Sequence, residues 1–309
     1  MIILGLMLLL GIGVQAQDNQ PQEKTSHWKA NGNIGLNFSQ GAYTNWAAGG
    51  QNSLAWQGIF NYTLNYANGK FKWDNTLNTS LGYNHFDFRL KPIKTDDKIE
   101  FTSLVGFKAT EKWFYSLELA FRSQFAYGFD YKTDSTQYIS KFLAPAYVNL
   151  GLGVEWTPNE HFTINFAPLT ARITIVNDDY LASIGAFGVN SLDPYDTTIH
   201  AKSDKVRFEF GARMTAKMQY TIIKNVDFES KLELFSNYLK DPQYIDVDWQ
   251  NLLILKVNSW LNCNLATHLI YDRDVPFYNP DPVTGEPVRV RHSKVQFKEV
   301  LSIGVMINI

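Results

Sequence analysis

The chain has 309 residues, of which 45% are hydrophobic and 15% are aromatic, and its formal charge at pH 7 is −2. A charge so close to zero gives no sign of nucleic-acid binding. Cys263 is the one cysteine, which excludes a disulfide within the chain, and the Cys, His and acid spacing of a zinc site is absent. We interpret Cys263 as a small hydrophobic residue.

The first residues have the pattern of a secretion signal. The apolar run from Ile2 to Val14 is too short to span a bilayer, and Val14-Gln15-Ala16 resembles a signal-peptidase site. We predict a signal peptide over residues 1–16, although no Lys or Arg precedes the apolar run, and a periplasmic segment over 17–26. The alternative is a buried N-terminal helix. No Cys follows Ala16, which argues against a lipoprotein signal, and no later window of 18 apolar residues predicts a spanning helix.

Residues 205–220, KVRFEFGARMTAKMQY, alternate between apolar and polar side chains. A period of two over 16 residues predicts a strand with one apolar and one charged face, because a helix would scatter the charges around its axis. The pattern recurs along the chain. It predicts twelve strands, near 27–38, 51–66, 70–86, 98–110, 112–128, 146–157, 161–176, 203–220, 225–239, 246–258, 260–272 and 294–308. The alternation shifts at Pro168, where we expect a β-bulge.

The connections between these strands alternate in length. Tight turns are predicted at Asn68-Gly69, Thr110-Glu111, Pro158 to Glu160, Lys224-Asn225 and Asn258-Ser259, and the other connections are longer. Short turns at one end, long loops at the other and an even strand number are typical of a bacterial outer-membrane barrel. We predict an all-β, twelve-stranded antiparallel transmembrane β-barrel over residues 27–309, with short periplasmic turns, long extracellular loops and both termini on the periplasmic side.

A soluble β-sandwich is the competing interpretation, with its apolar faces buried in one core. The predicted strands are longer than the five or so residues usual in globular proteins. Tryptophans also adjoin the tight turns, as in an interfacial aromatic belt: Trp73, Trp113, Trp156 and Trp260. Both observations favour the barrel, whose sheet closes because hydrocarbon leaves no water for an open edge.

The inward faces are charged in the second half of the chain. We predict a ladder of lumen charges formed by Lys205, Arg207, Glu209, Arg213, Lys217, Asp227, Glu229, Lys231 and Glu233. If Tyr220 faces Val226 across the turn, Lys217 faces Glu229 and Arg213 faces Glu233. The first half of the chain carries amides and hydroxyls at its inward positions instead. Two interpretations stay open, a polar interior that fills a narrow barrel and a charge-lined channel. Twelve strands lie between the eight of a barrel that side chains fill and the sixteen of a barrel that leaves an aqueous channel.

Signs of catalysis are weak. His85 with Asp87, and Asp272 with Asp274, lie near strand ends, where outer-membrane hydrolases carry their active sites, but the spacing is loose. His268 and His292-Ser293 have no evident partner in the sequence. The loop acids Asp178, Asp179, Asp193 and Asp281 suit weak Ca²⁺ binding, although solvated loops are the simpler interpretation. We expect no enzymatic activity and no cofactor, and keep a rim-located hydrolase as a remote alternative.

The segment FSQGAYTNWAAGGQNSLAW (38–56), followed by NGKFKWDNTLNTSLGYN (68–84), resembles the domain of unknown function 3078 of secreted proteins from Bacteroidetes-type bacteria. Its specific part is a loop with Asn45, Trp46, Gly49 and Gly50, where the glycine pair permits left-handed backbone or close approach. Trp46 is expected over the lumen or on the rim. The resemblance implies an outer-membrane barrel without a settled activity or catalytic residues. The chain departs from the common barrel pattern in ending at Ile309 without a terminal Phe.

Two functions follow from this sequence. The first is a narrow channel for passive transport of small solutes. The second is a structural or accessory subunit of an outer-membrane protein assembly. The expected partners are outer-membrane lipid and other outer-membrane proteins, and no nucleic acid.

Overall fold

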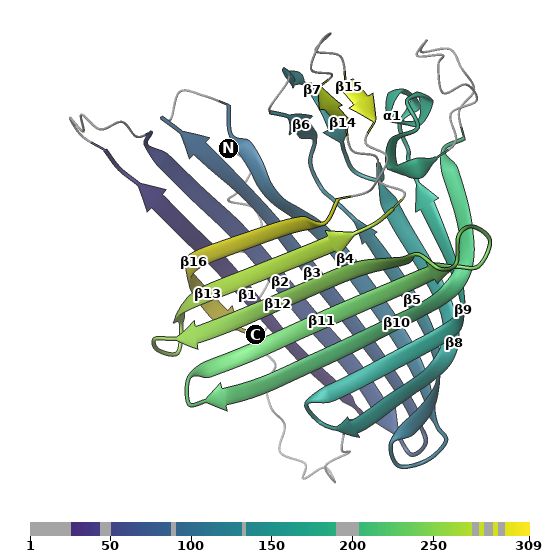
Figure 1. Cartoon of the computed structure of the whole chain (residues 1–309). Coiled ribbons are helices and arrows are strands. Elements are labelled where there is room, and N and C mark those ends of the chain that lie inside the picture. Colours follow the sequence, from purple (N-terminus) through teal and green to yellow (C-terminus); the bar gives the residue numbers. More distant parts are fainter. Residues whose placement is uncertain are drawn as a thin grey trace, which may run out of the picture.

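A computed structural model of the chain describes residues 26–43, 51–87, 91–131, 134–189, 204–273, 278–280, 287–289 and 294–309. Twelve antiparallel strands close into a barrel in the order β1-β16-β13-β12-β11-β10-β9-β8-β5-β4-β3-β2 (Figure 1). Their bounds are β1 Trp28–Gly41, β2 Ser53–Asn68, β3 Phe71–Phe86, β4 Ile93–Lys108, β5 Trp113–Ser123, β8 Ala146–Asn159, β9 Phe162–Ile175, β10 Val206–Ile223, β11 Val226–Asn237, β12 Ile245–Lys256, β13 Leu261–Tyr271 and β16 Gln296–Asn308. The predicted fold class and strand number are confirmed.

The five predicted tight turns join neighbouring strands at one end of the barrel, which we call the turn end (Figure 1). Gly69 and Asn225 have φ values of 60° and 67° in two of these turns. Left-handed backbone suits a hairpin turn, because its twist matches the twist of the flanking strands. The longer connections lie at the opposite end, which we call the loop end.

The bulge predicted at Pro168 is present. Gly211 pairs with Thr170 and Arg213 with Ala167, so β9 carries an extra residue against β10, and the register against β8 shifts at the same place. Proline cannot donate a hydrogen bond to the ladder, so the strand accommodates it by bulging.

The predicted register between β10 and β11 is wrong by two residues. Tyr220 pairs with Phe228 rather than with Val226, because β10 continues to Ile223 and the turn has two residues, with an irregularity between Thr221 and Ile223. Lys217 therefore lies opposite Lys231 rather than Glu229, and Arg213 lies opposite Phe235 rather than Glu233.

The strand predicted over 112–128 is shorter than expected. β5 ends at Ser123, because the Asp97 carboxylate accepts hydrogen bonds from the backbone N–H groups of Phe125 (2.7 Å) and Ala126 (2.9 Å). These bonds turn the chain out of the barrel wall and replace the backbone hydrogen bonds of the ladder. The chain then continues into a two-stranded sheet of β6 (Gly128–Asp130) and β7 (Asp134–Ser140).

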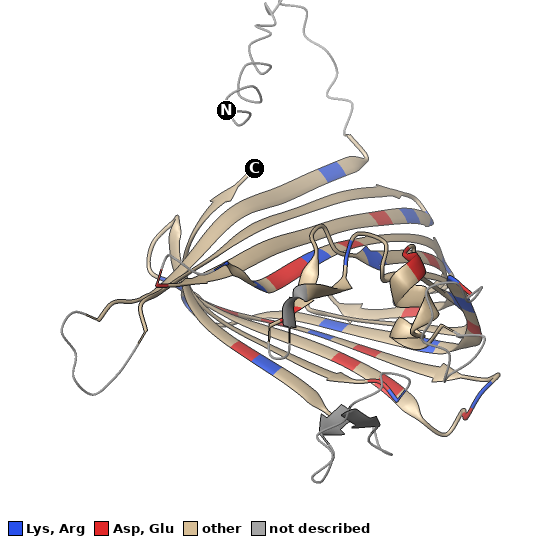
Figure 2. Cartoon of the chain, turned by 90° about the horizontal axis from the view of Figure 1, so that it is seen from above, with Lys and Arg blue, Asp and Glu red and all other residues tan. Residues whose placement is uncertain are grey.

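The other small elements also lie at the loop end. β14 (Tyr278–Pro280) pairs with β15 (Pro287–Arg289), and the connection after β9 holds α1 (Asp179–Ser183) and the 3₁₀ turn η1 (Ala186–Gly188). In Figure 2 this connection projects over part of the barrel opening. A small apolar cluster anchors it: Ala144, Val176, Leu181, Ala182 and Val189 are buried together.

None of the helices in the described ranges is long and apolar enough to cross a membrane.

Several sequence-based predictions fall on residues outside the described ranges. They are the signal peptide (1–16), most of the segment 17–26, the loop residues Asn45, Trp46, Gly49 and Gly50, the acids Asp193, Asp274 and Asp281, and His292-Ser293. These stay predictions.

Candidate functional site in the barrel lumen

The centre of the lumen holds a continuous ion-pair network. Arg213 of β10 contacts Glu118 of β5 at 2.7 Å and Glu233 of β11 at 2.8 Å. Glu233 also binds Lys231 at 2.7 Å, and Lys231 binds Glu100 of β4. Arg213 and Glu118 are each 5% exposed and Glu100 is 6% exposed, so water is largely excluded here. The Arg213–Glu233 contact predicted from sequence exists, although the register behind it was wrong, because the arginine reaches a residue two positions away from its direct partner, Phe235.

The network joins opposite walls of the barrel. Between β11 and β4, the strands that carry Lys231 and Glu100, lie four strands on one side and six on the other. A second bridge has the same span: Arg122 of β5 contacts Asp248 of β12 at 2.6 Å. Each bridge therefore crosses the lumen instead of lining one wall. Figure 2 shows Lys, Arg, Asp and Glu positions on several strands of the barrel.

Sequence reasoning missed most of the partners in these bridges. Glu100, Glu118, Arg122 and Asp248 occupy inward positions of the alternating pattern, which was the available signal. Only the tertiary fold reveals that Glu118 reaches β10, that Glu100 reaches β11 and that Arg122 reaches Asp248 of β12. The interpretation that His268 lacks a partner is also wrong, since its Nε2 lies 2.8 Å from Asp248 Oδ1.

An aromatic side chain also fills the lumen at the level of the ion-pair network. Phe235 occupies an inward position of β11, opposite Arg213, and is 2% exposed. The Arg172 guanidinium lies 3.5 Å from the centre of its ring and contacts Asp246 of β12 at 2.9 Å. A cation over an aromatic face is attracted to it, and more so where water is excluded. The lumen is therefore packed at this level.

The lumen is wetter toward the turn end. Lys217 is exposed although it points inward, and it makes no ion pair with any residue that the structure describes, whereas Arg213, four residues nearer the loop end, is buried. Asp227 binds Lys256 there, and Lys72 of β3 binds Glu155 of β8 at 2.5 Å. Water therefore reaches Lys217 in this half of the lumen, whereas Glu155 is only 2% exposed.

The remaining predicted charges are placed as follows. Lys205 lies before β10 and contacts Asp179 at 2.7 Å, Arg207 contacts Glu209 at 3.1 Å, and Glu229 lies opposite Gln219. On the opposite side of the lumen amides replace charges, as expected. Asn37 donates to Gln57 at 3.0 Å, and Gln57 donates to Asp96 at 2.6 Å.

At the loop end, Asp178 caps α1 and accepts hydrogen bonds from the Leu181 N–H (2.8 Å) and from Lys141, whose Nζ lies at 2.5 Å. Burial alone raises the pKa of Asp178, but these bonds outweigh burial and hold its pKa below its usual range. The cap therefore carries a carboxylate at neutral pH. Within the described ranges no three His, Cys, Asp or Glu side chains are grouped to hold a metal ion, and no hydrogen bond joins His85 to Asp87.

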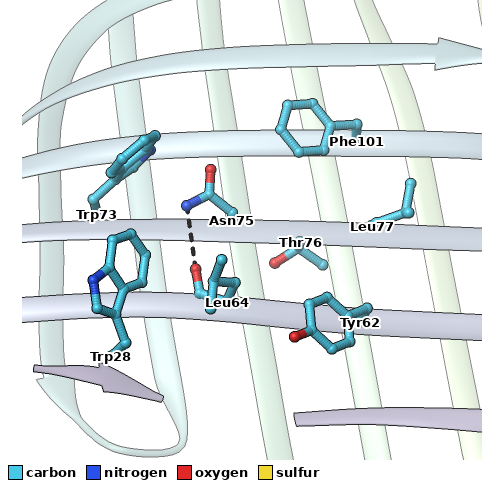
Figure 3. Close-up of a pocket in the computed structure, with 8 residues that line it drawn as sticks. All are labelled: Trp28, Tyr62, Leu64, Trp73, Asn75, Thr76, Leu77 and Phe101. Carbon is cyan, nitrogen blue, oxygen red and sulfur yellow. Dashed lines mark hydrogen bonds between the residues drawn. The ribbon is translucent and has the colours of Figure 1, made fainter. Parts of the chain in front are cut away.

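The outer wall is apolar, with aromatic residues near the turn end. Trp73, Trp113 and Trp260 are 38%, 45% and 51% exposed, and Trp113 stacks on Trp156 with 6.0 Å between ring centres. A groove of about 320 Å³ lies beside Trp28 and Trp73 (Figure 3). Asn75 in this groove donates its amide to the Leu64 carbonyl at 3.2 Å. Such a surface suits the acyl chains and interface of a lipid bilayer.

Comparison with known proteins gives one family match. The family described as "Protein of unknown function (DUF3078)" matches residues 38–129, which confirms the resemblance over that part of the chain. No curated protein matches the chain.

The chain is also similar to solved barrels. They include the NanC porin (11% identity, TM-score 0.38, 89% of this chain and 97% of that chain) and the translocator domain of the autotransporter NalP from Neisseria meningitidis (8%, 0.36, 92% and 89%). The outer-membrane channel DcaP of Acinetobacter baumannii is a third (8%, 0.29, 91% and 97%). A closed antiparallel barrel with a polar interior, an apolar outer wall and an aromatic row at one end is a bacterial outer-membrane β-barrel.

Proposed function

We propose that this barrel is a structural or accessory subunit of an outer-membrane protein assembly, and that its lumen is a packed polar core rather than a solute pathway. The observation that carries the proposal is the pair of bridges, Lys231–Glu100 and Arg122–Asp248, which join opposite walls through side chains. Removing one partner of a buried ion pair costs about 3–5 kcal/mol, and less where the pair is partly exposed, as Arg122 is with 34% of its side chain accessible. Both bridges cross the same lumen, so an open pathway requires both to part.

Conductance tests this proposal directly. The purified full-length protein in planar lipid bilayers is expected to show no steady ion current. Replacing Lys231, Arg122 and Phe235 with alanine removes one member of each bridge and the aromatic side chain beside them, and is expected to produce a current. Folding of the variant is checked by its circular dichroism. Steady current through the unaltered protein would overturn the proposal.

A narrow channel for small polar solutes is the second candidate. The exposed inward Lys217 favours it, because water reaches this side chain inside the lumen. Under this alternative the bridges are a gate, and the unaltered protein conducts. Replacing Lys217 with glutamate would then shift the current toward cations, because the channel wall loses a positive charge and gains a negative one.

A further inference from the structure

A row of polar side chains crosses the lipid-facing wall. Ser230, Asn251, Thr267 and Glu299 lie directly opposite one another on the neighbouring strands β11, β12, β13 and β16. All four occupy the outward positions of their strands, since the residues on either side of each point into the lumen.

Apolar rows flank this polar row on both sides. The row toward the loop end is Leu232, Trp249, Leu269 and Phe297, and the row toward the turn end is Phe228, Leu253, Leu265 and Leu301. Phe297 and Leu301 are 62% and 65% exposed. The polar row therefore lies within the apolar band of the wall and not at its edge.

Three members of the row have partners and the charged one has none. The Trp249 indole donates to Ser230 Oγ at 3.0 Å, and the Asn251 amide donates to Thr267 Oγ1 at 3.3 Å. Glu299 is exposed, and its carboxylate makes no hydrogen bond or ion pair with any residue in the described ranges. A lone carboxylate facing acyl chains is costly, and ionisable groups at membrane depth mark functional positions.

Glu299 also lies on an open strand edge. β16 pairs with β1 over six residue pairs, from Asn33–Asn308 to Phe38–Ile303. Toward the loop end, Gln296–Ser302 pair with β13 on one side, and no described residue pairs with them on the other. Figure 1 shows β1 and β16 diverging there. On the lumen side of this unpaired edge, Lys298 of β16 contacts Asp96 of β4 at 2.9 Å, so a side-chain ion pair is present where the backbone ladder is missing.

Unpaired backbone groups in hydrocarbon cost several kcal/mol each, so this edge calls for a cover. We propose that the loop-end half of β16 binds an extended segment of a different membrane protein, which adds a strand beside Gln296–Ser302 and places a Lys or Arg opposite Glu299. Strand addition satisfies the edge, and a cross-strand ion pair satisfies the carboxylate. A second copy related by a two-fold axis would set Glu299 against Glu299, which like-charge repulsion disfavours. This inference rests on the proposed accessory function and names its contact surface.

The test uses the full-length protein in phosphatidylcholine vesicles, with two fluorescent peptides as probes. Both are extended segments of about ten residues, the length that crosses a membrane as a strand. Valine and threonine alternate in both, with a central Lys in one and a central Glu in the other. The Lys peptide is expected to bind about fivefold more tightly, the upper range for one cross-strand ion pair. Glu299→Gln should abolish the preference and Glu299→Lys should reverse it. Glu160→Gln, a charge change at the turn end, should leave it intact.

A second experiment tests whether another copy of this chain, or lipid alone, covers the β16 edge. In a Cys263→Ala background, Glu299→Cys is expected to form little disulfide between copies. Efficient disulfide formation would overturn the proposal in favour of a second copy. Equal binding of both peptides, or binding of neither, would overturn it as well, with lipid alone covering the edge. Conductance of the same vesicles reports on the proposed function separately, so the two ideas fail independently.

Discussion

Arg213 offers the sharpest test of the lumen network, because it binds two carboxylates at once. Arg213→Met leaves Glu118 and Glu233 without their shared cation, but Glu233 keeps Lys231 at 2.7 Å and Glu118 keeps the Asn165 amide at 2.5 Å. The expected cost is therefore near the lower end for a broken buried pair, about 3 kcal/mol. Glu233→Met leaves Arg213 bound to Glu118 at 2.7 Å and Lys231 bound to Glu100, but it removes the charged contacts that Glu233 makes with Arg213 and with Lys231, which together cost about 3 kcal/mol.

The double variant is expected to lose about 4 kcal/mol, less than the sum of the single losses, because either change alone already removes the Arg213–Glu233 contact. Urea unfolding in lipid vesicles, followed by tryptophan fluorescence, measures each free energy. Asp241→Asn is the control: Asp241 and Arg273 form an exposed pair at 3.5 Å, and its loss should cost less than about 1 kcal/mol. Losses that add within about 0.5 kcal/mol would refute the coupling.

Four further outcomes are expected. Gly153→Ala should lower the unfolding free energy by more than about 3 kcal/mol in the same assay, since its Cβ would lie 2.0 Å from the Phe166 carbonyl, whereas Gly58→Ala, with its nearest atom at 3.9 Å, should cost far less. Cysteines at Val283 should react in intact cells with a membrane-impermeant maleimide and those at Glu111 should not; the reverse pattern would invert the topology. Mass spectrometry of the membrane-inserted protein should find Gln17 as the first residue, and a retained Met1 would contradict cleavage after Ala16. Because the pKa of Asp178 is lower in the folded protein, its stabilisation of α1 is complete above about pH 4 and is lost as pH falls through the folded value. The protection of the Leu181 amide, measured as its exchange rate relative to an unstructured amide at the same pH, should therefore fall only in acid, and protection that does not change with pH would exclude the cap's role.

The sequence predicted the barrel because the inward and outward faces of a strand alternate with period two, a local property that most of the wall strands display. It predicted the turn end for the same reason, since Asn68-Gly69 and Lys224-Asn225 specify tight hairpins by themselves. Register was harder to predict: a two-residue turn with an irregularity at Thr221 moved the β10–β11 pairing by two positions.

The lumen bridges could not be predicted in the same way. Lys231 and Glu100 are far apart in sequence and lie on nearly opposite strands, so their contact depends on how closely the two walls approach. Alternation says that both point inward, and it says nothing of the distance between them. The polar row on the outer wall was missed for a related reason. In the sequence, Glu299 and Asn251 are polar residues that interrupt the apolar faces of two separate strands. Only the strand register shows that they lie in one row.

The short β1–β16 ladder has a consequence for how the barrel forms. Phe38 and Ile303 come from the two ends of the described chain, so pairing them closes a loop of almost every residue, whereas each other neighbouring pair of wall strands lies much closer in sequence. Closing a longer loop loses more chain entropy, and contacts of high sequence separation form slowly. The hairpins around the wall should therefore assemble into a curved open sheet first, with β1 and β16 meeting last. Six residue pairs between β1 and β16 then close the barrel, and unfolding should begin with their separation.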